Sequence, residues 1–266
     1  MKNSFLILSL LTAFMVPVAA ETAAEKMAKQ LQDPLAYISA VITENTININ
    51  QKDELGNDRN SYDFQIQPVY SLNVSEDFSL VPRAVIPISG TPTGNSLTGE
   101  ETKWGVGDSI LQMFVAPKVD SDIKWGIGPQ VSLATHSNDR HKGPGNGAGI
   151  AGVLVAGEGA WSFAFIGHHL WGEDGFSTTT MQPIVYYNFE TMPGVFVAYN
   201  NNWSYDWNGQ GDKWTIPLGL SAGKVLDLGG GYGLEFLVGG YKMVAHPDSG
   251  PEWQGKFGLS LVMPRD

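Results

Sequence analysis

The chain has 266 residues, of which 16% are charged and 32 are glycine, and its formal net charge is −11. This acidic balance argues against nucleic acid as a partner, because binding phosphates needs clustered Lys and Arg. The sequence contains no cysteine, which excludes disulfides and thiolate sites. A charged fraction below the roughly 25% of soluble domains, with abundant Gly and aromatic residues, is typical of a barrel with one lipid face and one wet face.

The first twenty residues have the form of a secretory signal peptide. Lys2 gives a positive start, residues 5–16 are apolar, and Val18-Ala19-Ala20 is a small-residue cleavage site. The apolar run is too short for a membrane anchor. We therefore expect residues 1–20 to be removed, residues 21–34 to form an N-terminal periplasmic or plug helix, and residues 35–266 to form one barrel domain.

The expected N-terminal helix carries a capping signal. Thr22 and Glu25 have the spacing at which each side chain satisfies the backbone N–H of the other. Met27 and Leu31 belong to one apolar face, and Pro34 ends the helix. A helix this short needs a surface on which to dock. Two interpretations remain open: a small plug at the periplasmic mouth, or a frayed leader helix.

Period-two alternation of apolar and polar residues dominates the remaining chain. It is clearest from Ser61 to Ile88, which reads as two strands joined by a tight turn at residues 73–76. Strands of about ten residues are long enough to cross a membrane. The expected strands are Ala40–Asn50, Ser61–Leu72, Asp77–Ile88, Gly105–Pro117, Ile123–His136, Gly149–Ala156, Ala160–Trp171, Thr178–Phe189, Gly194–Tyr205, Lys213–Lys224, Tyr232–Val244 and Trp253–Met263.

The connections between these strands alternate in length. Every second connection, such as residues 137–148, is long, polar and rich in turn residues, whereas those between are short. Outer-membrane barrels show this pattern, with short periplasmic turns and longer extracellular loops. An even number of strands then leaves both termini on the short-turn side, the periplasm.

Tryptophan placement supports the same architecture. Five tryptophans fall at the long-loop ends of their strands, with Trp203 nearby, and Trp125 and Trp161 fall at the short-turn ends. Two aromatic belts of this kind mark the two lipid headgroup regions. The five are Trp104, Trp171, Trp207, Trp214 and Trp253.

The last strand alternates in the same way and can pair with the first, which leaves no open edge, as a membrane requires. We therefore predict an all-β fold: a closed antiparallel transmembrane β-barrel of about twelve strands with a short N-terminal helix.

The residues of opposite parity to the apolar face are predicted to line the lumen. They are mostly amides, which suit a neutral or weakly polar solute, or alternatively a filled, hydrogen-bonded interior. Because cations are costly on the lipid face, Arg83 and Lys256 are expected inside, near Asp206 or Glu235. They form either a selective constriction or a salt-bridge network that stiffens the wall. The candidate solute-contacting residues are Gln65, Gln67, Arg83, Gln112, Gln130, Gln182, Asn200, Asn202, Asp206, Glu235 and Lys256.

The sequence offers no catalytic or metal site and indicates no cofactor. His168 and His169 are adjacent, so on a strand they point to opposite sides and cannot chelate one metal. The run His136-Ser137-Asn138 has the residue types of the outer-membrane phospholipase, but adjacent residues do not converge as a triad must. We therefore do not expect an enzyme, and a hydrolase is the least favoured alternative.

Several motifs together resemble a known family. They include FQIQPVYSL, GVGDSILQMFVAPK, WGIGPQVSLATHS, YDWNGQGDKWTIPLGLSAGKV and PEWQGKFGLSLVMP. In this order the chain resembles the Gram-negative outer-membrane proteins labelled as transporters or as members of the meta-pathway of phenol degradation, sometimes mislabelled neuromedin U. Met263 stands where such barrels end on an aromatic residue, which weakens the expected assembly signal.

The resemblance implies an outer-membrane channel or transporter for small solutes, including aromatic or hydrophobic ones. The alternative is a structural or surface-interaction barrel with a filled lumen. The expected partners are outer-membrane lipid, a small-molecule solute and the barrel assembly machinery.

Overall fold

The computed structural model describes residues 22–53, 55–95 and 100–265. The predicted signal peptide, residues 1–20, lies outside the described residues. The described chain forms one α-helix and a single antiparallel sheet of fifteen strands. No helix in this part of the chain is long and apolar enough to cross a membrane.

In the described ranges the strands follow one another along the chain with no α-helix between them. Two short 3-10 helices, Asp139–His141 and Glu173–Gly175, lie in loops. The other elements are α1 (Ala23–Leu31), β1 (Ser39–Lys52), β2 (Asp58–Tyr70), β3 (Leu72–Asn73), β4 (Phe78–Asn95), β5 (Glu100–Val106), β6 (Ser109–Pro117), β7 (Ile123–Leu133), β8 (Gly147–Glu158), β9 (Trp161–Trp171), β10 (Ser177–Asn188), β11 (Val195–Asn200), β12 (Trp203–Asp206), β13 (Trp214–Gly229), β14 (Tyr232–Ala245) and β15 (Trp253–Met263).

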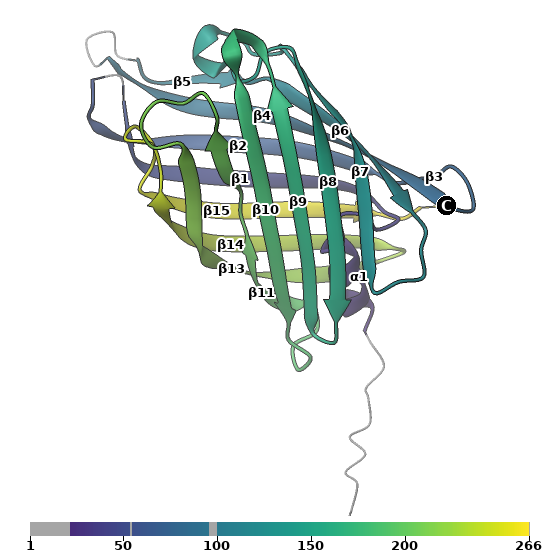
Figure 1. Ribbon diagram of the computed structural model, residues 1–266. Helices are drawn as coiled ribbons and strands as arrows, with labels where there is room; N and C mark the ends of the chain where they lie inside the picture. Colours follow the sequence, from purple (N-terminus) through teal and green to yellow (C-terminus); the bar gives the residue numbers. More distant parts are fainter. Residues whose placement is uncertain (1–21, 54, 96–99, 266) are drawn as a thin grey trace, which may run out of the picture.

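The sheet closes on itself. The first strand, β1, pairs with the last, β15, from Ser39–Met263 to Ile49–Trp253 (Figure 1). Three strands continue another across a short break: β3 continues β2, β6 continues β5, and β12 continues β11. The fold is therefore a closed antiparallel barrel with twelve strands in its wall, as the alternation predicts.

The alternation along each strand separates an apolar outside from a packed inside. In β6, Leu111, Met113 and Val115 are exposed on the outer face, whereas Gln112 and Phe114 are buried within the barrel. Successive side chains of a strand point to opposite faces, so this pattern follows directly from the sequence. An apolar outer band of this kind is the surface that lipid-embedded barrels present.

The predicted aromatic belts are present. Trp104 and Trp171 are 58% and 56% exposed at the long-loop end, and Trp125 and Trp161 are each 45% exposed at the other end. A ring this exposed is not part of a protein core. The two belts mark the edges of the apolar band, where amphipathic rings favour the lipid headgroups.

Some strand boundaries differ from the prediction. Strand β4 runs on to Asn95, because its hairpin with β5 continues to the pair Asn95–Glu100 beyond the predicted end. Strand β13 likewise extends to Gly229. Strand β7 ends at Leu133 rather than at His136. The backbone N–H and the ring of His136 bond instead to the carboxylate of Asp108, which lies between β5 and β6.

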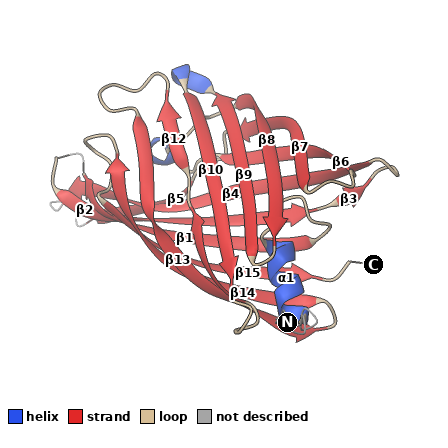
Figure 2. Ribbon diagram, turned by 60° about the horizontal axis from the view of Figure 1, so that its bottom comes forward, coloured by secondary structure: helices blue, strands red, loops and turns tan. Residues whose placement is uncertain are grey.

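Helix α1 begins with the predicted capping box. The hydroxyl of Thr22 accepts a hydrogen bond from the Glu25 N–H (3.3 Å), and the Glu25 carboxylate accepts one from the Thr22 N–H (2.7 Å). Figures 1 and 2 place the helix at the short-turn end of the barrel, the end at which the described chain finishes.

Candidate functional site in the barrel lumen

Helix α1 seats its apolar face against the inside of β13 and β14. Met27 and Ala28 are buried there, although the helix itself has solvent on its other side. The seat depends on Gly233, because a Cβ at that position would lie 1.7 Å from the Met27 sulfur. The helix therefore fits a notch that a glycine leaves open in the wall, which favours the plug over the frayed leader.

The segment after α1 is fixed by polar contacts to the far wall. The amides of Gln32 and Asn188 donate to each other, at 2.8 and 2.9 Å, and both residues are buried. Asp33 forms an ion pair with Lys124 at 2.7 Å. A reciprocal amide pair satisfies buried polar groups without introducing charge. These contacts hold residues 32–38 across the short-turn mouth.

Above this segment the lumen holds a small cavity of about 100 Å³. One part of its lining is polar and contains Gln67, Arg83, Gln182, Asn200 and Glu235. The other part is apolar and aromatic, and its members are Val69, Val81, Phe114, Ile166, Ile184 and Tyr186. An apolar lining with a few placed polar groups is typical of a pocket for a small organic ligand.

Two of the charged candidates, Lys256 and Glu235, are buried within the barrel, but they do not pair with each other or with Asp206. Lys256, which is 4% exposed, forms an ion pair with Glu44 of the adjacent strand β1. Asp206 lies exposed at the long-loop rim and accepts a hydrogen bond from the Asn208 N–H (3.1 Å). The carboxylate of Glu235 accepts one from the Ser260 hydroxyl (3.3 Å). Lys256 therefore faces inward as predicted, but its ion-pair partner is Glu44 rather than Asp206 or Glu235.

The other predicted cation, Arg83, donates to the side-chain oxygen of Gln67 at 2.5 Å. Gln67 in turn donates to Gln65 at 2.8 Å. Arg83 borders the cavity on the wall formed by β2 and β4. Among the described residues, its guanidinium is therefore held by an amide and not by an ion pair with Asp206 or Glu235.

The remaining amides form two short chains across the interior. Gln112 donates to Gln130 at 3.0 Å, and Gln130 lies 3.2 Å from Nδ1 of His168. On the facing wall, Gln182 donates to Asn200 at 2.9 Å. Amides in such chains fix one another's orientation while leaving other donors and acceptors toward the lumen.

Asn202, like Asp206, is a candidate that the structure does not bring to this network. It lies in the break between β11 and β12, where it is exposed. The preceding residue, Asn201, is buried instead and donates to Gln254 at 3.2 Å. The alternation of inward and outward side chains does not continue through a break in strand pairing. The sequence pattern therefore pointed to Asn202, whereas the buried residue is Asn201.

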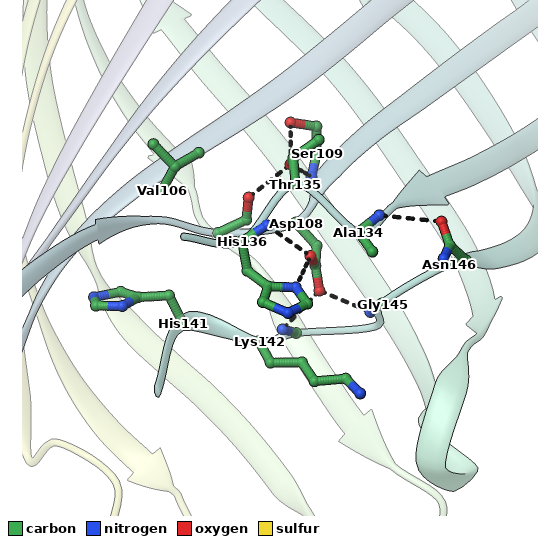
Figure 3. A network of polar contacts seen from close by, with 12 residues as sticks. Val106, Asp108, Ser109, Ala134, Thr135, His136, His141, Lys142, Gly145 and Asn146 are labelled. Carbon is green, nitrogen blue, oxygen red and sulfur yellow. Dashed lines mark hydrogen bonds and ion pairs between the residues drawn. The ribbon is translucent and has the colours of Figure 1, made fainter. Parts of the chain in front are cut away.

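A second cavity, of about 330 Å³, lies nearer the long-loop end. It is bordered by the inward residues His168, Thr178 and Thr180 on one side and by the loop of residues 134–146 on the other. Figure 3 shows this loop folded against the junction of β5 and β6. The loop therefore narrows the route above the first cavity.

Asp108 holds this loop in place (Figure 3). Its fully buried carboxylate accepts hydrogen bonds from the His136 ring (2.6 Å) and from the N–H groups of Gly143 (2.8 Å) and Gly145 (2.7 Å). His141 is also buried and lies 3.2 Å from the carbonyl oxygen of Ser89. A carboxylate surrounded by donors fixes a loop more firmly than a neutral acceptor does.

Three residues central to this arrangement were missed from the sequence. Glu44 shares the parity of Ala40 and Ile42, so its inward direction was readable from alternation. Gln32 and Asp108 lie outside regular strands, where parity gives no direction. Among the described residues, no group of three or more His, Asp or Glu side chains is placed to hold a metal ion.

Comparisons with known proteins agree with the architecture. No family model matches the chain, and no curated protein matches it in sequence. Its structure is similar to that of an outer-membrane channel from Pseudomonas putida F1, with a TM-score of 0.61 and 13% identity, over 86% of this chain and 97% of that one.

Two further solved structures are less similar. Outer membrane phospholipase A from Escherichia coli has a TM-score of 0.48 at 13% identity, over 91% of this chain and 98% of that one. The KdgM porin has a TM-score of 0.44 at 12% identity, over 85% and 99%. Scores this low support no argument about activity. The closed barrel, its aromatic belts and the first similarity together show that the chain has the fold of a bacterial outer-membrane β-barrel channel.

Proposed function

We propose that the protein is an outer-membrane channel for small, weakly polar solutes, including aromatic ones, and that its N-terminal segment restricts it. The observation that carries this proposal is the cavity of about 100 Å³ in the lumen, which the amide pair of Gln182 and Asn200 borders. Its lining combines the aromatic rings of Phe114 and Tyr186 with the polar groups of Arg83 and Glu235. General diffusion pores have a polar, water-filled lumen instead.

The fold supports the proposed location. In outer-membrane barrels the short turns face the periplasm. The N-terminal helix and the C-terminal end of the last strand both lie at the short-turn end, so we assign both termini to the periplasm. Lipid then contacts the apolar outer band, and assembly into the membrane requires the barrel assembly machinery.

The filled structural barrel is the second candidate, and the ion pair of Lys256 with Glu44 favours it. A pair of this kind stiffens the wall whether or not solute passes. The two candidates differ in a measurable way, because a filled barrel has no route that opens when the N-terminal segment is removed.

The test uses folded protein in liposomes, with swelling measured in isosmotic glycerol, sodium benzoate or sucrose. We expect swelling in glycerol and benzoate but not in sucrose. Deletion of residues 22–35 is expected to increase every rate. Empty vesicles and heat-denatured protein are the controls. If neither the intact nor the shortened barrel passes any solute, the channel is excluded and the structural barrel remains. Release of fatty acid from the same vesicles would instead indicate an enzyme.

A further inference from the structure

A long apolar groove crosses the outer surface of the barrel. Its volume is about 580 Å³, and it runs over β1, β2, β4, β6 and β7. Its outward lining residues include Val41, Pro68, Ala84, Met113, Val131 and Met263. A groove of this kind lies within the band that faces lipid, so its occupant there is apolar.

Interrupted strand pairing accounts for the depth of the groove. Between β2 and β4 the register pairs Ile66 with Ile86 and Val69 with Arg83, and the residues between are unpaired in this described part of the wall. A similar gap separates β6 from β7 beside Pro129. Proline lacks a backbone N–H and cannot donate a hydrogen bond to the neighbouring strand, so a local gap opens between the paired strands.

The wall is thin at this place. The inward residues Arg83, Gln112 and Gln130 border the same groove from the inner side. Arg83 bonds to Gln67, and Gln112 bonds to Gln130, inside the barrel. An apolar occupant of the groove therefore does not need to satisfy these polar groups.

At the short-turn end of the groove lies a fixed positive charge. The guanidinium carbon of Arg265 is 4.1 Å from the ring centre of Tyr37 and 4.0 Å from that of Tyr70. Tyr70 itself lines the groove, as do Met263 and Ser39. Two cation–π contacts hold the guanidinium between the rings at the level of the headgroups.

This arginine is half-buried. Its Nη1 is buried, so a ligand meets the remaining part of the guanidinium group. Guanidinium groups bind phosphate oxygens in a planar, two-pronged geometry that an ammonium cannot reproduce. A positive group at the end of an apolar groove thus matches the two parts of a phospholipid, a phosphate and an acyl chain.

We propose that the groove between β1 and β7 is a specific phospholipid site, with the phosphate at Arg265 and one acyl chain along Pro68, Ala84 and Met113. The bound lipid covers the thin part of the wall. The site lies outside the lumen and is independent of which solute the channel passes.

The experiment is native mass spectrometry of the folded barrel in detergent, with palmitoyl-oleoyl phosphatidylglycerol added as the probe. The two test variants act at opposite ends of the site. Arg265→Gln removes the charge, and Ala84→Phe fills the groove. Lys118→Gln is the matched control for a cation at the short-turn end, and Val238→Phe is the control for a lipid-facing position outside the groove.

We expect the wild-type barrel and both controls to keep one lipid per chain, and both test variants to lose most of it. Heat-modified mobility on a gel checks that each variant is folded. Three outcomes would overturn the proposal: full retention by Arg265→Gln, full retention by Ala84→Phe, or equal binding of diacylglycerol, which has no phosphate. Competition by glycerol phosphate alone would show an ion site without an acyl chain, and a lipid-free dimer would assign the groove to a second copy; either result also overturns it.

Discussion

Lys256 on the last strand forms an ion pair with Glu44 on the first, across the seam at which the barrel closes. Lys256 is nearly inaccessible to solvent, and Glu44 is 23% exposed. The pair therefore joins the two ends of the sheet from within the lumen, beside the backbone ladder that joins them along the wall.

The first prediction concerns this seam. Lys256→Met leaves Glu44 as an unpaired charge inside the barrel. Removing one partner of a buried pair costs about 3–5 kcal/mol, and the partial exposure of Glu44 places the expected loss at the lower end. Urea unfolding in vesicles, followed by tryptophan fluorescence, measures it. The double variant with Glu44→Gln should regain part of the loss, and a double variant as unstable as the single one would contradict the pairing.

The second prediction concerns the seat of α1. Gly233→Val places side-chain atoms where the Met27 sulfur lies, so the helix is expected to leave its notch and conductance in planar bilayers to rise several-fold. Gly240→Val on the same strand is the matched control, because no atom lies within 4 Å of a Cβ at that position. Equal conductance of the two variants would show that α1 does not restrict the channel.

The third prediction concerns the folded loop of residues 134–146. Asp108→Ala removes the acceptor of hydrogen bonds from His136, Gly143 and Gly145, so the loop should open and trypsin should cut after Arg140 or Lys142 about tenfold faster. Asp139→Ala, an exposed acid in the same loop, is the control. Unchanged cleavage of the Asp108 variant would mean that other contacts hold the loop.

The fourth prediction is a pH dependence at the loop tips. Lys142 bonds to Asp174 at 2.6 Å and pairs with Glu173 at 3.3 Å, joining two loops. The hydrogen bond from Lys142 lowers the pKa of the Asp174 carboxyl, and the bond to Asp174 raises the pKa of Lys142. The hydrogen bond from Asn146 lowers the pKa of Glu173.

The signs fix the pH window. A lowered carboxyl pKa gives stability that is present above the unfolded value, about 4, and is lost as pH falls through the folded value. A raised lysine pKa gives stability that is lost only as pH rises above about 10. Since the chain has no cysteine, a spin label at Asp139→Cys is unique. The mobility of the label should rise in acid, and Lys142→Gln should remove this change. A label that is equally mobile at pH 7 and pH 3 would show that the ion pairs of Lys142 do not join the two loops.

The closed barrel was predictable from the sequence because strand alternation is local. In β6 the exposed and buried residues alternate without a break, and the sequence shows the same alternation. The alternation of short and long connections predicted which end of each strand faces the periplasm. Nothing beyond neighbouring residues was needed for either inference.

The contacts inside the lumen were not predictable in the same way. Parity shows that Lys256 faces inward, but its partner depends on how far neighbouring strands are staggered, which places Glu44 within reach and Asp206 at the rim. At Asn202 a break in pairing ended the parity, and the buried amide became Asn201. Asp108 bonds to residues of the loop 134–146, about thirty positions further along the chain. Loops have no periodic pattern from which such a contact could be predicted.

The position of α1 also bears on how the protein is made. The helix precedes every strand in the chain, yet it rests on β13 and β14, and the segment behind it is bonded to Asn188 at the end of β10. Those surfaces exist only once β10, β13 and β14 are in place. The helix is therefore synthesised before the part of the wall on which it rests, and it can take its seat only after those strands have formed.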